Sequence, residues 1–229
     1  NYLAKCYNAK FDVKTAKIYY EKTLELDPKH IESIYNLGIY FCHWAKLSKN
    51  ESLKIKKQIL ELQNDAKKSA KILNVKKTIF FDYPDNELDS VSLLKVIKTI
   101  EKLISEEKPE RIYTSHYKDL NVDHRRVFEA TLTACRPFSF SVKEIICFEI
   151  LSSTEWSFSY DFKPNYFINI EKELTSKIKA MKIYKNEIRK FPHPRSIENI
   201  KISANRWGTV CNFIAAEPFE IIRKFEKQF

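Results

Sequence analysis

Apolar residues recur at helical spacing along much of the chain. They predict an amphipathic helix over residues 53–73 and another from about residue 93 to just before Pro109. The same periodicity predicts helices over 123–135, 171–189 and 196–205. Each of these segments has one apolar face, so the helices are expected to cover a common layer.

Short apolar runs between these helices predict the strands of that layer. They lie at 78–83, 111–115, 143–150 and 166–170, with a further extended segment at 210–215. A strand, a helix and a strand joined by short connections form a right-handed crossover with parallel strands, and 78–83, 93–108 and 111–115 fit that unit. The pattern predicts an α/β fold with a parallel sheet. The only glycines are Gly38 and Gly208, so the sequence holds no Gly-rich phosphate loop.

Residues 1 to about 45 have a different pattern. Small residues at Ala4 and Gly38 stand about one 34-residue period apart, with aromatic residues between them. The stretch YYEKTLELDPKHIESIYNLGIYF resembles a tetratricopeptide repeat junction, a helix–turn–helix unit that buries its face against neighbouring units. The resemblance implies a protein partner for residues 1–45. The alternative is an appendage that serves only packing.

Composition narrows the class of protein. The chain has 229 residues, 44% of them hydrophobic, which suffices for the core of one medium domain with a smaller appendage. Its net charge of +10 comes from dispersed lysines, so solvated faces are favoured over a nucleic-acid surface. No apolar run reaches the roughly 18 residues of a membrane span.

Cysteine usage favours a reducing compartment. The cysteines are odd in number and widely spaced, and no Cys-x-x-Cys occurs. Reduced and mostly buried thiols in a cytoplasmic protein are therefore expected. The five cysteines are Cys6, Cys42, Cys135, Cys147 and Cys211.

Candidate chemistry gathers in HYKDLNVDH, which runs from His116 to His124 directly after the strand at 111–115. Ligands of parallel sheets bind beyond the carboxyl ends of the strands, and His124 begins a helix at that edge. Asp123, or Asp119 in the loop, can orient an imidazole that binds a metal. The alternative is that Asp123 caps the helix and His124 is an exposed residue of its first turn.

A second candidate is KFPHPRSIENI, residues 190–200. His193 stands between Pro192 and Pro194, which restrict the backbone on both sides. Such a turn can hold the imidazole or Arg195 in place. The alternative is the ordinary start of the helix that follows.

A third candidate is FEILSSTEWSF, residues 148–158. Glu149, Thr154, Glu155 and Trp156 follow the carboxyl end of a predicted strand, and polar groups beside an indole can bind a sugar. The alternative is a polar loop with one aromatic anchor.

The order of these segments along the chain is similar to the order of motifs in one enzyme family. FFDYPDNELD, RIYTSHYKDLNVDHRRVFEATLTACRP, FEILSSTEW, PNYFINI, KFPHPRSIENI and AAEPFEII follow one another along the chain. From about residue 53 to 225 the chain resembles the LmbE-like, PIG-L-type N-deacetylases. That resemblance implies a Rossmann-like domain over 53–229 and hydrolysis of N-acetyl groups on N-acetylglucosamine-type sugars or glycoconjugates.

The resemblance also implies a zinc site. In the family, two ligands come from an early His-Pro-Asp-Asp-Glu motif after the first strand, and the third is the histidine matched here by His124. Zinc polarises the amide carbonyl and activates a bound water, while an aspartate of the early motif acts as base. A family histidine often stands three residues before the third ligand. Here that position is Asn121, which is expected to bind substrate.

Other roles follow from the same match. Asp123 and His193 are expected to be catalytic, His193 as a protonatable donor near the reacting carbonyl. Arg195 and Glu155 are expected to contact substrate.

The chain departs from the family in one respect, since no His-Pro-Asp-Asp-Glu occurs in its 229 residues. The only His-Pro is His193-Pro194. We therefore expect an incomplete Rossmann-like sheet without the first strand–helix unit, weak zinc binding and no activity of this chain alone. A non-catalytic scaffold is the alternative. The sequence leaves open whether the chain, which begins with Asn1, is a fragment, a wrongly joined gene product or a natural pseudoenzyme.

Overall fold

The structure, a computed structural model, describes residues 55–137, 142–159 and 161–226. Contacts divide the chain into two compact units, Asn1–Asn64 and Asp65–Phe229, and the second contains the sheet. The predicted tetratricopeptide-like segment, residues 1–45, lies outside the described residues. The predicted first helix is present at 55–72, although Ile59 and Leu62 of its apolar stripe are 46% and 45% exposed.

Four strands form one mixed sheet in the order β1–β2–β4–β3. They are β1 (Arg111–Ser115), β2 (Glu144–Phe148), β3 (Tyr166–Asn169) and β4 (Ala216–Lys224). β1 and β2 are parallel, but β4 runs antiparallel to both β2 and β3. The prediction of an all-parallel sheet is therefore wrong for its C-terminal half.

The predicted strand at 78–83 does not form. These residues pair with none of the described strands, and Ile79, Phe80 and Phe81 are between 37% and 48% exposed. A run of apolar residues becomes a strand only where a neighbour supplies hydrogen bonds, and no described strand does so here. The predicted crossover from 78–83 to 111–115 is thus wrong, and the parallel pair is β1 with β2.

The last strand begins later than the predicted extended segment at 210–215. The preceding helix continues to Val210, and residues 211–212 turn before β4 starts at Ala216. β4 lies between β2 and β3, yet it contains Pro218, which has no backbone N–H to donate. Phe219 accepts a hydrogen bond from Asn165 on the β3 side and pairs with Phe148, the last residue of β2, so Pro218 faces the space beyond the end of β2.

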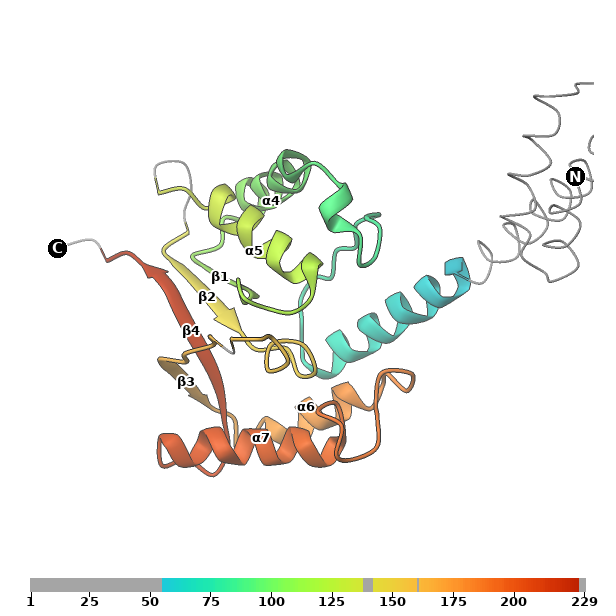
Figure 1. The fold of residues 1–229 in the computed structure, drawn as a ribbon, viewed down its shortest axis with the longest axis vertical. Coiled ribbons are helices and arrows are strands. Elements are labelled where there is room, and N and C mark those ends of the chain that lie inside the picture. The colour runs from blue at the N-terminus through green and yellow to red at the C-terminus, as the bar shows by residue number, and fades with distance from the viewer. Residues whose placement is uncertain (1–54, 138–141, 160, 227–229) are drawn as a thin grey trace, which may run out of the picture. The chain divides into compact units, whose positions relative to one another are not determined.

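Helices cover both faces of the sheet (Figure 1). α4 (Leu93–Glu107) and α5 (Val122–Ala134) lie on one face, and α6 (Leu174–Met181) and α7 (Ile197–Val210) lie on the other. α4 and α5 match the predicted positions, whereas α6 is shorter and α7 longer than predicted. The main core lies between α4, α5 and the strands β1 and β2, and it includes Val96, Ile97, Ile104, Ala130, Ala134 and Ile145.

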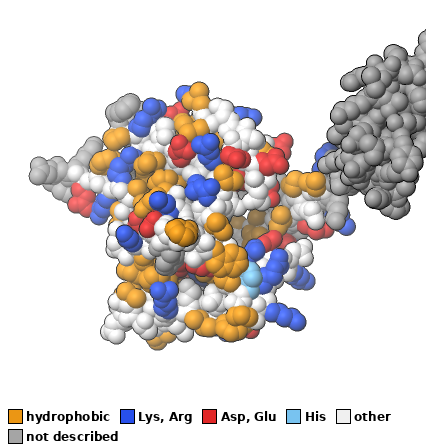
Figure 2. All heavy atoms as spheres, in the orientation of Figure 1, with side chains coloured by type: hydrophobic (Ala, Val, Ile, Leu, Met, Phe, Trp, Pro, Cys, Tyr) orange, Lys and Arg blue, Asp and Glu red, His pale blue; other side chains and the backbone are white. Residues whose placement is uncertain are grey.

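The surface charges and the burial of two cysteines match what the sequence predicts. Figure 2 shows Lys and Arg dispersed over the face in view, among Asp, Glu and hydrophobic side chains. Cys135 and Cys147 are buried, as predicted, and burial raises the pKa of their thiols to about 11 and about 12. Within the described ranges, no helix has the length and apolar character to cross a membrane.

Candidate functional site

The loop 116–121 carries the chain from β1 to α5 at the edge where the carboxyl ends of β1 and β2 meet. Asn121 is the N-cap of α5, and its Oδ1 accepts hydrogen bonds from the amides of Asp123 (2.8 Å) and His124 (3.4 Å). Its Nδ2 donates to Oδ1 of Asn86 at 2.7 Å. Asn121 therefore determines where α5 begins and how His124 leaves the helix.

Asp123 uses both carboxylate oxygens on backbone groups. Oδ2 accepts from the amide of Asn86 at 2.8 Å, and Oδ1 accepts from the amide of Leu88 at 2.9 Å. The side chain thus joins the turn at 85–88 to the start of α5. These contacts hold the loop, so the orienting role considered for Asp123 falls to Asp119.

Asp119 is the centre of the site. It is 1% exposed and accepts hydrogen bonds from the amide of Asn121 (2.9 Å), Nδ1 of His124 (2.8 Å), Oγ1 of Thr154 (2.7 Å) and Oγ of Ser153. The donors come from the loop after β1, from α5 and from the loop after β2. One carboxylate therefore joins three segments of the chain.

These donors keep Asp119 ionised. Burial alone would raise the pKa of its carboxyl group, but the hydrogen bonds from His124, Ser153, Thr154 and the Asn121 amide outweigh burial and hold it at about 2.

His124 presents one ring nitrogen to the site. Because Nδ1 faces an ionised carboxylate, Nδ1 is the nitrogen that donates to Asp119, which leaves Nε2 for another partner. The side chain is 29% exposed, and among the described residues Nε2 has no hydrogen-bond partner. A carboxylate on one nitrogen of a histidine is the arrangement that orients the other nitrogen toward a metal ion.

His116, the other histidine of the motif, is structural. It is fully buried, its Nδ1 accepts the amide of Lys118 at 3.2 Å, and its ring packs against Tyr117 and Phe162. Nε2 lies 3.3 Å from Oε2 of Glu220 without the direction of a hydrogen bond. Burial lowers the pKa of His116, although the neighbouring carboxylate of Glu220 opposes this.

The loop after β2 is folded on itself. Oγ1 of Thr154 accepts the amide of Ile150 at 2.7 Å, and the carboxylate of Glu155 accepts the amides of Ser152 (2.6 Å) and Ser153 (3.2 Å). Glu155 thus stabilises the turn that brings the hydroxyls of Ser153 and Thr154 to Asp119.

His193 and Trp156 form a second pair. Their ring centroids are 5.5 Å apart in an edge contact, and Nδ1 of His193 accepts the amide of Arg195 at 3.1 Å. The guanidinium of Arg195 donates to Glu187. Within the described ranges, no hydrogen bond joins His193 or Arg195 to His124.

The structure thus gathers Asp119, Asn121, Asp123 and His124 with the 149–156 loop, and places Trp156 of that loop against His193. Ser153 was absent from the sequence-based candidates. The run Ser152-Ser153-Thr154 directly after a strand was a signal for it, since hydroxyls at a sheet edge can donate to a buried carboxylate.

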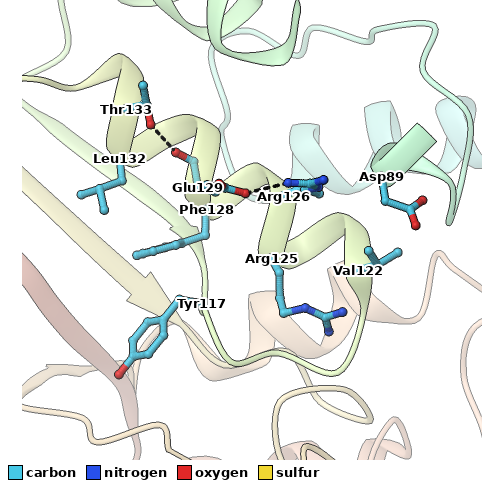
Figure 3. Close-up of a pocket in the computed structure, with 9 residues that line it drawn as sticks. All are labelled: Asp89, Tyr117, Val122, Arg125, Arg126, Phe128, Glu129, Leu132 and Thr133. Atoms are coloured by element: carbon cyan, nitrogen blue, oxygen red, sulfur yellow. Dashed lines mark hydrogen bonds and ion pairs between the residues drawn. The ribbon is translucent and has the colours of Figure 1, made fainter. Parts of the chain in front are cut away.

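A separate cavity of about 510 Å³ lies against α5 (Figure 3). Three of its four charged side chains are engaged: Arg126 pairs with Glu129 at 2.9 Å, and Arg125 donates to the carbonyls of Asp119 and Leu120. Tyr117 and Phe128 line it as well, and none of the predicted site residues does. This cavity is therefore separate from the predicted site residues.

Two sequence comparisons point to one group of proteins. A family model described as PIG-L, GlcNAc-PI de-N-acetylase, matches residues 39–135. The uncharacterized deacetylase YaiS of Escherichia coli (strain K12) is 28% identical over 134 residues, which are 56% of this chain and 67% of YaiS. The matched part of the chain is thus similar to PIG-L/LmbE-like deacetylases.

Two solved structures share the fold of this chain. The conserved protein TT1542 from Thermus thermophilus has a TM-score of 0.59 at 15% identity, over 73% of this chain and 76% of that one. N,N′-diacetylchitobiose deacetylase from Pyrococcus horikoshii has a TM-score of 0.56 at 20% identity, over 72% of this chain. The match covers 64% of the chitobiose deacetylase chain. The mixed α/β sheet described above is thus similar to deacetylase folds.

Zinc, which the PIG-L/LmbE-like resemblance implies, needs more than His124. In the part of the chain that the structure describes, no group of three or more His, Cys, Asp or Glu side chains is arranged to hold a metal ion. Asp119 is already saturated by its donors, and Asp123 by two amides. The described residues therefore do not fit a complete zinc site.

Proposed function

We propose that this chain carries the His124 side of an N-deacetylase site. The substrate class is an N-acetylglucosamine-type sugar or glycoconjugate, and the reaction is hydrolysis of its N-acetyl group. One observation carries the proposal: ionised Asp119 holds Nδ1 of His124 and leaves Nε2 accessible at the carboxyl edge of the sheet. The family model, YaiS and the chitobiose deacetylase, which are all named as deacetylases, support the reaction class.

The residues around His124 have positioning roles in this proposal. Asp119 sets the tautomer and the direction of the ring, and Asn121 and Asp123 fix the start of α5 from which it projects.

His193 accepts a backbone amide on Nδ1, so a proton on its Nε2 can be donated to a carbonyl oxygen of the substrate. Glu155 and Arg195 are expected to act on the substrate indirectly, through the shapes of their loops.

We further propose that the chain by itself binds zinc weakly and does not turn over. His124 is one ligand, and the sequence has no His-Pro-Asp-Asp-Glu to supply two others. No catalytic step through zinc is assigned to these residues.

Metal binding and turnover test the proposal together. Elemental analysis of the purified chain is expected to give far less than one zinc per chain, and an N-acetylglucosamine conjugate is expected to remain acetylated. In a zinc titration followed by NMR, the imidazole signals of His124 should shift, while those of buried His116 should not. Stoichiometric zinc with ordinary turnover would refute the weak-binding proposal. A titration in which His124 does not respond would refute the ligand assignment.

A non-catalytic scaffold is the second candidate, favoured by the lack of a three-ligand group among the described residues. In that case residues 1–45 bind a protein partner and the deacetylase-like domain is a platform. A pull-down from native extract is then expected to depend on residues 1–45 and to be unchanged by His124→Ala. If the unaltered chain has a measurable activity and the single substitution His124→Ala abolishes it, the scaffold function is excluded.

A further inference from the structure

A cavity of about 1060 Å³ opens on the α7 face of the sheet. Its floor includes Tyr113, Phe148 and Phe219, one from each of three strands, and Ile200 of α7 forms part of its wall. Leu73, after helix 55–72, closes another side. Asp119, His124 and His193 do not line this cavity, although its Glu149 belongs to the loop whose Ser153 and Thr154 donate to Asp119.

Two carboxyl groups and one ammonium group interrupt the apolar lining: those of Glu149, Glu217 and Lys177. Nζ of Lys177 lies 2.5 Å from Oε1 of Glu217, so these two charges neutralise each other. Among the described residues, Glu149 has no such partner. Of the two carboxyl groups that line the cavity, Glu149 is the one without an opposite charge in direct contact.

Glu149 is held with one oxygen free. Its Oε1 accepts the indole N–H of Trp207 at 2.9 Å, and among the described residues its Oε2 receives no hydrogen bond. Burial raises the pKa of Glu149, partly offset by the bond from Trp207. A carboxyl group in this setting is stabilised by any cationic donor that enters the cavity.

We propose that this cavity binds an amphiphile that has an apolar chain and a primary ammonium group. The chain fills the space between the sheet and α7, and the ammonium group donates to Oε2 of Glu149. The volume is that of a small-molecule site, which combines apolar walls with a few placed polar groups. A carboxylate ligand is excluded because it would face Glu149, and an alcohol lacks the charge. The site is independent of the proposed deacetylase function.

Isothermal titration of the full chain with n-octylamine, octan-1-ol and octanoate tests the proposal. Octylamine is expected to bind at least tenfold more tightly than octanol, and octanoate is expected not to bind. Shortening the amine should weaken binding about fourfold for each methylene removed. Glu149→Gln, which keeps the shape of the side chain, should reduce octylamine to the affinity of octanol.

Two further variants separate the site from general effects. Glu198→Gln removes a carboxylate from the first turn of α7 outside the cavity, and it should leave octylamine binding unchanged. Ser203→Trp places a large side chain into the cavity and should abolish binding of both octylamine and octanol. Equal affinity for octylamine and octanol, no binding of octylamine, or full binding by Glu149→Gln overturns the proposal. If Glu149→Gln does not fold, the comparison of ligands on the unaltered chain decides.

Discussion

Asp119 is the residue on which the candidate site depends most. It is almost fully buried and receives four hydrogen bonds, two of them from side-chain hydroxyls of the loop after β2. This hydrogen-bond network is favourable only when it is complete, because the donors would lose their partner if the carboxylate were absent.

Asp119→Asn should therefore destabilise the protein. The amide nitrogen of asparagine would face donors such as Thr154 and His124, so we expect the free energy of unfolding to fall by roughly 2–4 kcal/mol. Urea denaturation followed by circular dichroism measures it. Asp161→Asn is the matched control, since Asp161 is a partly exposed carboxylate that accepts from the hydroxyl of Ser159. Equal stability of the two variants would contradict the central role of Asp119.

The pKa of Asp119 gives a pH dependence with a definite sign. Its folded value of about 2 lies below the ordinary value of 3.8, so the folded state binds this proton less readily than the unfolded chain. The resulting stabilisation, on the order of 2 kcal/mol, is present above about pH 4 and is lost as the pH falls toward 2. Unfolding free energies measured from pH 5 to pH 2 should show this loss in the unaltered chain. The loss should be correspondingly smaller in Asp119→Asn.

At the scale of elements, α5 and α7 show how helix ends position the site. Asn121 caps α5 directly below His124, and Ser196, which is fully buried, caps α7 by accepting the amide of Asn199 at 3.0 Å. Both caps follow loops that carry candidate residues, so the helix starts and the site geometry are determined by the same side chains.

Asn121→Ala should remove the cap of α5 and cost about 1 kcal/mol of unfolding free energy. Asn121→Asp keeps the accepting oxygen and should retain most of that stability, although it loses the bond to Asn86. Thermal unfolding of both variants measures the difference. If alanine were no worse than aspartate, Asn121 would not act through the cap.

Gly208 lies where the last turn of α7 touches the chain entering β4. A Cβ atom there would stand 2.6 Å from the carbonyl oxygen of Phe213 and 2.9 Å from the amide nitrogen of Ala215. Both are backbone atoms, so the loop itself would have to move, and Gly208→Ala should cost roughly 1–3 kcal/mol. Asn205→Ala, on an exposed position of the same helix, should change stability little. Chemical denaturation compares the two, and a stabilised Gly208→Ala would show that the close approach is absent.

At the scale of the whole molecule, the described part of the sheet ends in an edge strand. β1 pairs only with β2 among the described strands, and Tyr113 of β1 is 42% exposed. Phe80 and Phe81 add exposed apolar surface on the irregular segment before α4. Edges and apolar surface of this kind favour association between copies.

We therefore expect the chain to self-associate at micromolar concentration. Replacing both Phe80 and Phe81 by lysine should lower the fraction of oligomer in sedimentation velocity experiments, because charge opposes close apolar contact. Leu94→Lys is the matched control, because Leu94 is another exposed apolar residue, on α4, and it also gains a charge. An unchanged oligomer fraction in the Phe80/Phe81 variant would place the association elsewhere.

Local pattern determined much of this protein. Helical periodicity located the helix at 55–72, α4, α5 and the start of α7, since one apolar face per helix is a local property. It placed α6 inside a longer predicted helix, 171–189. The residue types in DLNVDH also marked the start of α5 and the residues of the candidate site. The ligand role of His124 remains a prediction that the zinc titration tests. The roles of His193, Arg195 and Glu155 also remain predictions.

Only the tertiary structure decided which segments pair and which carboxylate serves which group. Residues 78–83 have the composition of a strand but no neighbour among the described strands to bond with, while β4 forms despite Pro218 because the proline lies past the end of β2. The division of labour between Asp119 and Asp123 has the same cause. Both precede the same histidine in sequence, but the donors that select between them come from residues 86–88 and 153–154, whose positions depend on folding of the whole sheet.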